Sequence, residues 1–175
     1  LKGAKIIHIN PLPETGLVRF KHPQDYMKLD LSSTGLADMH LQVKIGGDAA
    51  LLRAINKLTI DSESIDKKFI SKKTKSYDEF AKSLQQIDWE RIETDSGIPK
   101  SEIKKFSDII VKSKSIISCW AMGLTQHKKG VYVIQEVVNL HLLGGHIGRI
   151  GAGLCPVRGH SCLLYTSDAA DDMAS

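Results

Sequence analysis

Short apolar runs alternate along the chain with polar turns and amphipathic stretches. Residues 4–9 form an apolar run that ends at two prolines, and residues 36–45 alternate apolar and polar positions, which is typical of a half-buried strand. A third apolar run, residues 115–120, predicts another strand. Helical periodicity occupies residues 49–58 and 130–143. This order predicts an α/β fold, with a Rossmann-like parallel sheet flanked by helices.

The middle of the chain is charged and predicted to be helical. Its clearest helix begins after Pro99. Three apolar residues at helical spacing mark the buried face of this helix: Ile103, Phe106 and Ile110. The basic run at residues 67–75 has a single aromatic residue and is followed by acidic residues, so we interpret it as a solvated face. We therefore expect no nucleic-acid partner.

The composition is that of an ordinary globular protein. Of the 175 residues, 42% are hydrophobic and 25% are charged, which disfavours disordered and collagen-like classes. No apolar run reaches the roughly 18 residues of a spanning helix, so we expect no membrane span. No export signal is visible, and Cys119 and Cys155 lack a metal-ligand spacing. We expect a reducing, cytoplasmic compartment, no metal ligand, and Cys119 as a small buried hydrophobe.

The last residues, 162–175, differ in character from the rest of the chain. They contain three acidic residues and no basic one, and their CLLYTSDAAD stretch looks like the translation of a sequencing-library adapter. We therefore expect one domain over residues 1–161, followed by an artefactual, disordered tail. A flexible native terminus is the alternative that this composition also permits.

Polar turns that follow the predicted strands are candidates for a ligand site. Residues 10–14, the Gly46-Gly47-Asp48 turn and residues 122–126 would gather at one edge of a parallel sheet. Glycine amides could approach a phosphate, while Asp48 could accept hydrogen bonds from a ribose or guanine donor. In the plain structural alternative, the glycines only make a turn and Asp48 only caps the helix. No G-x-G-x-x-G follows a strand, which disfavours a nicotinamide dehydrogenase.

A glycine-rich tract, residues 144–153, precedes a P-V-R-G segment that contains Arg158. Five glycines in ten residues let the backbone pass close to a bulky ligand or another strand. The Arg158 guanidinium could bind an oxyanion with a bidentate fork. The alternatives are a structural salt bridge for Arg158 and surface imidazoles for His146 and His160.

In combination, these motifs resemble those of the molybdopterin oxidoreductases, specifically the formate-dehydrogenase-like alpha subunits. Three motifs in fixed order carry the resemblance: M-G-x-x-Q-H, G-x-I-G-x-x-G-A-G and P-V-R-G. The similarity runs through residues 4–25, 36–55 and 120–161. His146 stands where the family has Asn, and Ile150 where it has Pro, which leaves the conformation of the glycine-rich loop open.

The resemblance implies a bis-molybdopterin guanine dinucleotide cofactor with molybdenum, and two-electron redox chemistry on a small-molecule substrate. Formate is the best-known substrate among such proteins. Arg158 is implied as the catalytic residue, near the metal, where it helps to position the substrate. The implied cofactor-binding residues are Asn10, Pro11, Leu12, Pro13, Glu14, Gly46, Gly47, Asp48, Met122, Gly123, Gln126 and Gly159.

The resemblance also places other parts of the machinery outside this chain. A 4Fe-4S cluster and the molybdenum ligand are implied upstream of Leu1, together with an electron-transfer partner, and the second guanine dinucleotide is implied to be held downstream. We therefore expect this polypeptide alone to be inactive and to bind cofactor weakly or not at all. The alternative from another class is a non-catalytic Rossmann-like nucleotide-binding module.

Overall fold

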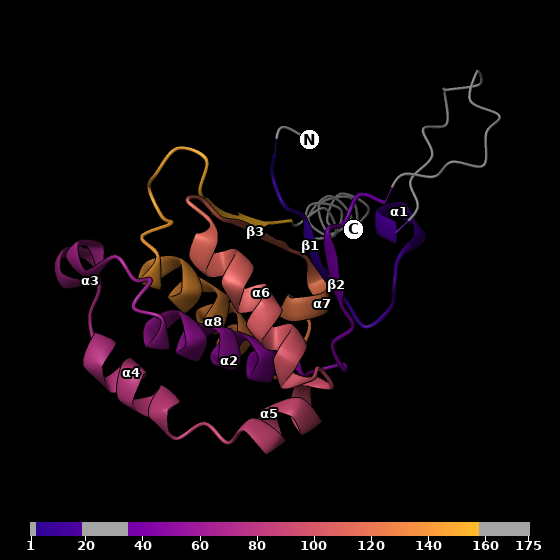
Figure 1. The fold of residues 1–175 in the computed structure, drawn as a ribbon, viewed down its shortest axis with the longest axis horizontal. Coiled ribbons are helices and arrows are strands. Elements are labelled where there is room, and N and C mark those ends of the chain that lie inside the picture. The colour runs from indigo at the N-terminus through magenta and orange to yellow at the C-terminus, as the bar shows by residue number, and fades with distance from the viewer. Residues whose placement is uncertain (1–2, 19–34, 158–175) are drawn as a thin grey trace, which may run out of the picture.

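The computed structural model describes residues 3–18 and 35–157. Arg158, Gly159 and the expected tail therefore lie outside the described residues. The strands are β1 (Ile7–Ile9), β2 (Met39–Leu41), β3 (Ile117–Trp120) and β4 (Gly153–Pro156) (Figure 1). The helices are α1 (Thr15–Val18), α2 (Asp48–Asp61), α3 (Lys67–Lys73), α4 (Tyr77–Gln85), α5 (Trp89–Ser96), α6 (Lys100–Lys112), α7 (Met122–Thr125) and α8 (Gly130–Leu143).

The strands pair in parallel, β1 with β2 and β3 with β4. Together with the flanking helices, this arrangement confirms the predicted α/β class. Within the described part of the chain the strands form two separate two-stranded sheets, and each strand is only three or four residues long. The strand expected at residues 36–45 ends early because the Lys44 N–H donates to the Ser96 carbonyl (2.8 Å) at the end of α5, not to a neighbouring strand.

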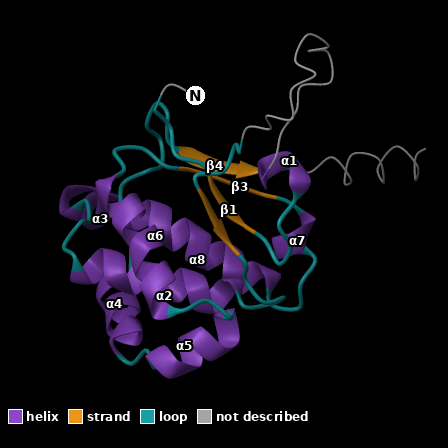
Figure 2. Cartoon of the chain, turned by 45° about the vertical axis from the view of Figure 1, so that its right-hand side comes forward, coloured by secondary structure: helices purple, strands orange, loops and turns teal. Residues whose placement is uncertain are grey.

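Helix α2 lies at the centre of the helical layer. It packs against α4, α5, α6 and α8, and the strands lie along one side of these helices (Figure 2). The predicted helix at residues 130–143 is confirmed, as is the helix after Pro99, where Ile103 and Phe106 are buried. The main core consists of Leu41, Val43, Leu51, Ala54, Ile55, Ile92, Ile98, Ile103, Phe106 and Leu140.

A buried polar network joins α2 to α8. Glu136 is only 2% exposed, and its carboxylate accepts hydrogen bonds from Arg53 Nη1 (3.0 Å) and Asn56 Nδ2 (2.9 Å). Arg53 also donates to the Tyr132 hydroxyl (3.0 Å) and to the Ser83 carbonyl (3.0 Å). Because a buried carboxylate is stable only when it is paired, this network fixes how the two helices meet.

The basic run in the middle of the chain is a solvated helix, as predicted. Within α3 only Ile70 is buried, and the basic side chains of the helix are exposed. Its first turn is capped by Asp66, whose carboxylate accepts a hydrogen bond from the Phe69 N–H (2.8 Å). Across residues 3–18 and 35–157, no helix has the length and apolar character needed to cross a membrane.

Strand β3 presents alternate side chains to opposite faces, and this alternation decides the position of Cys119. On one face, Ser118 Oγ lies 2.8 Å from His141 Nε2 of α8, and Trp120 packs against an apolar cluster formed by Leu52 of α2 and Val133 and Val137 of α8. Cys119 points to the other face and is exposed, so the expectation that it is buried is wrong. It pairs in register with the exposed Cys155 of β4.

Candidate functional site

A cavity of about 250 Å³ lies where the start of α2 meets α7 and the start of α8. We call it the α2–α7 cavity. It brings together two segments that are far apart in the sequence, the turn before α2 and the turn after β3. Its lining residues are Gly46, Asp48, Gly123, Leu124, His127, Lys128, Lys129 and Val133.

Two glycines shape the turn before α2, each for a different structural reason. Gly46 has a φ of +81°, a left-handed conformation that L side chains rarely adopt. Gly47 lies against backbone: a Cβ at this position would come within 2.5 Å of the Asp95 carbonyl oxygen and 2.9 Å of Ser96 Cα. Gly47 is therefore required by the close approach of the α5 end, and it sets the position of the residue that follows.

Asp48 is the first residue of α2, and its side chain is half-buried at the cavity. The expectation that Asp48 caps the helix is wrong: Gly47 occupies the N-cap position, and no side-chain cap bond forms there. Asp48 lies one residue after the N-cap position and does not cap the helix. Its carboxylate is therefore available to a ligand in the cavity. Burial raises the pKa of this carboxyl, while its own backbone N–H and the charge of His127 partly oppose that rise.

Basic residues dominate the opposite side of the α2–α7 cavity. His127, Lys128 and Lys129 are exposed and follow directly after α7. A Cβ at Gly46 would lie 3.6 Å from His127 Cε1, which shows how closely the two turns approach each other. The resemblance assigns no cofactor contact to these three residues. The H-K-K run, which begins at the last residue of the M-G-x-x-Q-H motif, is the sequence signal that points to them.

Other predicted cofactor-binding residues lie near this cavity or away from it. Gly123 lines it, whereas Met122 and Gln126, at the ends of the α7 turn, are exposed and are not among its lining residues. No atom lies within 4 Å of a Cβ placed on Gly123, so the backbone of α7 is open at this point. The turn after β3 thus contributes Gly123 and Leu124 to the cavity, whereas Met122 and Gln126 do not line it.

Side-chain hydrogen bonds hold the turn after β1 together. Asn10 Nδ2 donates to the Leu12 carbonyl (2.9 Å) and to Glu14 Oε1 (3.0 Å), and Gln42 Nε2 donates to the Pro11 carbonyl (3.0 Å). These bonds give the turn a defined shape. Residues 10–14 do not line the α2–α7 cavity, so the structure does not bring them together with Asp48 there.

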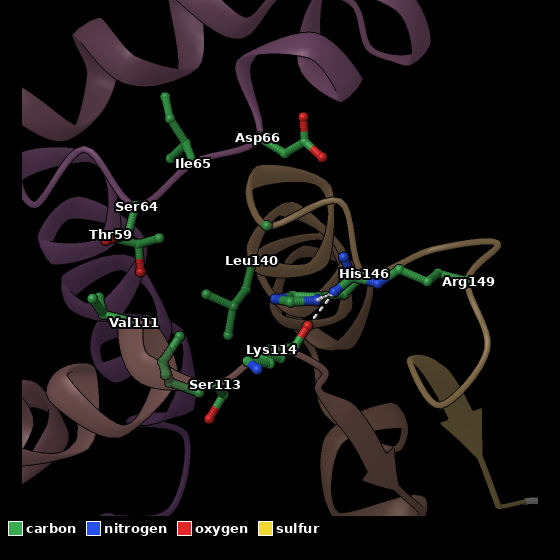
Figure 3. A pocket seen from close by; sticks show the side chains of 12 residues that line it. Thr59, Ser64, Ile65, Asp66, Val111, Ser113, Lys114, Leu140, His146 and Arg149 are labelled. Atoms are coloured by element: carbon green, nitrogen blue, oxygen red, sulfur yellow. Dashed lines mark hydrogen bonds between the residues drawn. The ribbon is translucent and has the colours of Figure 1, made fainter.

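The first part of the glycine-rich tract lines a different cavity, of about 360 Å³ (Figure 3). His146 and Arg149 lie on its wall, together with Asp66 and Lys114. None of the predicted cofactor-binding residues lines this cavity. A Cβ on Gly144 would collide with the His146 ring, so this glycine makes room for a side chain at the end of α8. We had expected the glycine-rich tract and the turns after the strands to form one site, but within the described residues they line two separate cavities.

His146, at the position where the family has Asn, belongs to a buried histidine pair. Arg149 donates a hydrogen bond to His146 Nδ1 (2.8 Å), which fixes that nitrogen as an acceptor, and the His146 carbonyl lies 3.5 Å from His141 Nδ1. His146 is 7% exposed. Burial, with help from the charges of Arg149 and His141, lowers the pKa of His146 to about 4. The imidazole is thus neutral at physiological pH and serves as a structural acceptor.

Comparison with known proteins relates most of the chain to parts of longer proteins. No family model matches the chain. The chain is 40% identical over 171 residues to the protein YdeP of Escherichia coli, a match that covers 91% of this chain and 22% of that protein. It is 38% identical over 165 residues to a Mycobacterium tuberculosis protein named as an uncharacterized oxidoreductase, which covers 91% of this chain and 21% of that protein.

A third relative, from Staphylococcus aureus, carries the name "Putative formate dehydrogenase" and is 39% identical over 132 residues, covering 75% of this chain and 13% of that protein. Among solved structures, the chain is similar to acetylene hydratase from Pelobacter acetylenicus, with a TM-score of 0.66 and 20% identity over 86% of this chain and 18% of that one. The latter likeness establishes the fold. The chain spans about a fifth of the curated relatives named first. These matches support a relationship to oxidoreductase-like proteins, in line with the resemblance to the molybdopterin oxidoreductases.

Proposed function

We propose that this chain is part of a molybdenum-dependent oxidoreductase and that its α2–α7 cavity holds the guanine nucleotide end of a bis-molybdopterin guanine dinucleotide. One observation carries the proposal. Gly46, Asp48 and Gly123, which the resemblance assigns to cofactor binding, line one cavity although they come from two segments far apart in the sequence. A cofactor bound in this cavity would contact both segments.

The donors and acceptors of the cavity suit a guanine nucleotide. The half-buried Asp48 carboxylate offers two oxygens that can accept from the ring N–H and amino group of guanine, which are adjacent donors. Lys128 and Lys129 supply positive charge for phosphate groups. Gly123 presents open backbone, so a flat base can approach it closely.

The residues of this chain would bind and orient the cofactor, and the bound group would supply two-electron redox chemistry at molybdenum. By the resemblance, Arg158 would position a small substrate such as formate. Electrons would leave through a 4Fe-4S cluster to an electron-transfer partner. In this proposal the cluster, the molybdenum ligand and the electron-transfer partner belong to the longer protein, and the present chain alone would not oxidise or reduce the substrate.

Equilibrium dialysis of the chain with guanosine diphosphate tests the nucleotide site. We expect weak, saturable binding that adenosine diphosphate does not match, because adenine offers Asp48 no adjacent pair of donors. Asp48→Asn should reduce guanosine diphosphate binding by roughly tenfold, equivalent to about 1.4 kcal/mol. Equal binding of the two nucleotides, or no effect of Asp48→Asn, would contradict the site.

A second measurement separates an oxidoreductase from a non-catalytic nucleotide-binding module, because both would pass the dialysis test. The chain should be extended to the full length of its relatives and purified, and its molybdenum content measured against protein. We expect bound molybdenum together with a pterin fluorescence signal. Nucleotide binding without molybdenum would support the module and overturn the redox part of the proposal.

A further inference from the structure

The two cysteines of the parallel pair β3–β4 occupy one register position. Cys119 is the Cα partner of Cys155. Neighbouring strands lie roughly 4.8 Å apart, and paired side chains project to the same face of the sheet. That spacing falls within the Cα separation of about 4.4–6.8 Å at which a disulfide can form. The register therefore places the two thiols side by side on one face of the strand pair.

The face that carries these thiols is open in the described part of the chain. Ser118 and Trp120 occupy the opposite face, against α8, whereas Cys119 and Cys155 are both exposed. Ile117, on the same face as Cys119, is 60% exposed. Among residues 3–18 and 35–157, no group of three or more His, Cys, Asp or Glu side chains is arranged to hold a metal ion. A small oxidant can therefore reach the pair, and a multidentate metal site does not explain it.

We propose that Cys119 and Cys155 form a redox-active dithiol, which a low-molecular-weight disulfide such as oxidised glutathione converts to a cross-strand disulfide. In the first step one thiolate attacks oxidised glutathione, forms a mixed disulfide and releases one glutathione thiolate. In the second step the other protein thiolate attacks that mixed disulfide, closes the S–S bond and releases a second glutathione. The chain loses two electrons and two protons, and oxidised glutathione is reduced to two glutathione molecules.

Cys119 and Cys155 lie close in sequence to the implied cofactor and substrate segments, so a disulfide between them would constrain both. Cys119 lies three residues before Met122, where the implied cofactor-binding segment begins. Cys155 lies three residues before Arg158, the residue implied to position the substrate. A disulfide would tie together the ends of the strands that lead into these segments. The inference depends only on the β3–β4 geometry, so it stands whether or not the proposed nucleotide site is correct.

Exposure and pairing predict how this dithiol should respond to its environment. Burial at the contact, followed by the hydrogen bond and charge of Cys155, raises the pKa of the Cys119 thiol. Thiolate is the attacking species, so oxidation should speed up as the pH rises above neutrality. Exposed disulfides between neighbouring strands are more easily reduced than buried structural ones, so glutathione should reopen the bond.

Mass spectrometry after trypsin digestion tests the proposal. The full chain carrying Cys162→Ser is equilibrated with mixtures of oxidised and reduced glutathione, and its free thiols are blocked with N-ethylmaleimide at low pH. Trypsin separates the two cysteines into peptides 115–128 and 150–158. We expect these two peptides to be joined by a disulfide, with about tenfold or more cross-link from the folded chain than from the chain in concentrated urea.

Single variants serve as matched controls. Cys119→Ser and Cys155→Ser should each lose the cross-linked peptide pair and carry at most one glutathione on the remaining cysteine, with an unchanged circular dichroism spectrum. Three results would overturn the proposal. These are stable glutathione adducts on both cysteines without the cross-link, an equal cross-link yield in urea, and disulfides only between separate chains.

Discussion

Asp48 and Gly123 line the same cavity, one at the first residue of α2 and the other inside α7. The carboxylate of Asp48 is half-buried, and the α7 backbone is open at Gly123. The Asp48 carboxylate, which can accept hydrogen bonds, and the open backbone at Gly123 thus lie beside Lys128 and Lys129. This relationship makes the α2–α7 cavity a candidate nucleotide site, and it can be tested at single residues.

The two glycines on either side of the cavity should respond differently to alanine. Gly47→Ala places a Cβ against the backbone of Asp95 and Ser96, so we expect a loss of about 2 kcal/mol or more in the free energy of unfolding. Gly123→Ala meets no atom within 4 Å and should leave stability unchanged or slightly higher, while weakening guanosine diphosphate binding. Urea unfolding and dialysis measure both effects. Equal stability of the two variants would contradict the close approach at Gly47.

Asp48→Asn should raise the stability of the chain at neutral pH in the absence of nucleotide. Because burial raises the pKa of Asp48 above its ordinary value of 3.8, the wild type loses stability as the pH rises through the raised pKa and the carboxylate ionises. An asparagine has no such penalty. We expect a rise of a few degrees at most in Tm at pH 7, as for a change of about 1 kcal/mol. The difference should vanish in acid, and a variant that is less stable than wild type at pH 7 would contradict the account.

The local elements of this fold were predictable because they depend on nearby residues. The helix over residues 130–143 follows from its apolar periodicity, and the helix after Pro99 from its start signal and its spacing of Ile103 and Phe106. The sequence also named Asp48 and Gly123, but the argument that grouped them assumed turns along the edge of one parallel sheet, whereas β2 and β3, which precede these turns, lie in separate sheets.

Contacts over long sequence separations were not predictable in the same way. The register that pairs Cys119 with Cys155 depends on where both short strands begin, and no local pattern specifies this. The error on Cys119 has the same origin, because the apolar run gave no sign of which strand face α8 covers. The Arg53–Glu136 pair was missed for a related reason: an apolar helix pattern conceals a buried charge whose partner lies on another helix.

His146→Asn should weaken the acid sensitivity of the chain. The folded-state pKa of His146, about 4, lies below its ordinary value of 6.5, so the stabilising contribution is complete above pH 6.5 and is lost as the pH falls toward 4. Asparagine can still accept the Arg149 hydrogen bond and does not titrate.

We expect the loss of unfolding free energy between pH 6.5 and about 4 to shrink by roughly 1–3 kcal/mol in His146→Asn. Urea unfolding at several pH values measures it. A His146→Asn curve parallel to wild type would show that the buried imidazole does not carry this pH dependence.

Arg53→Met should destabilise the chain strongly because it leaves the Glu136 carboxylate buried without its cation. The pair is 3.0 Å apart and Glu136 is 2% exposed, so a loss of about 3–5 kcal/mol is expected. Arg91→Met removes the exposed partner of Asp95 and should cost no more than about 0.5 kcal/mol. Adding Glu136→Gln to Arg53→Met should restore part of the loss. Similar losses in the two single variants would contradict the role of burial.

Titration of the isotope-labelled chain with guanosine diphosphate, followed by the amide signals in nuclear magnetic resonance spectra, shows directly whether a guanine nucleotide binds in the α2–α7 cavity. We expect signals from Gly46 to Asp48 and from Gly123 to Lys129 to shift together with one dissociation constant, and adenosine diphosphate to shift them less. Shifts confined to the cavity at His146 and Arg149, or no response from the α2–α7 cavity at saturating nucleotide, would contradict a nucleotide site there.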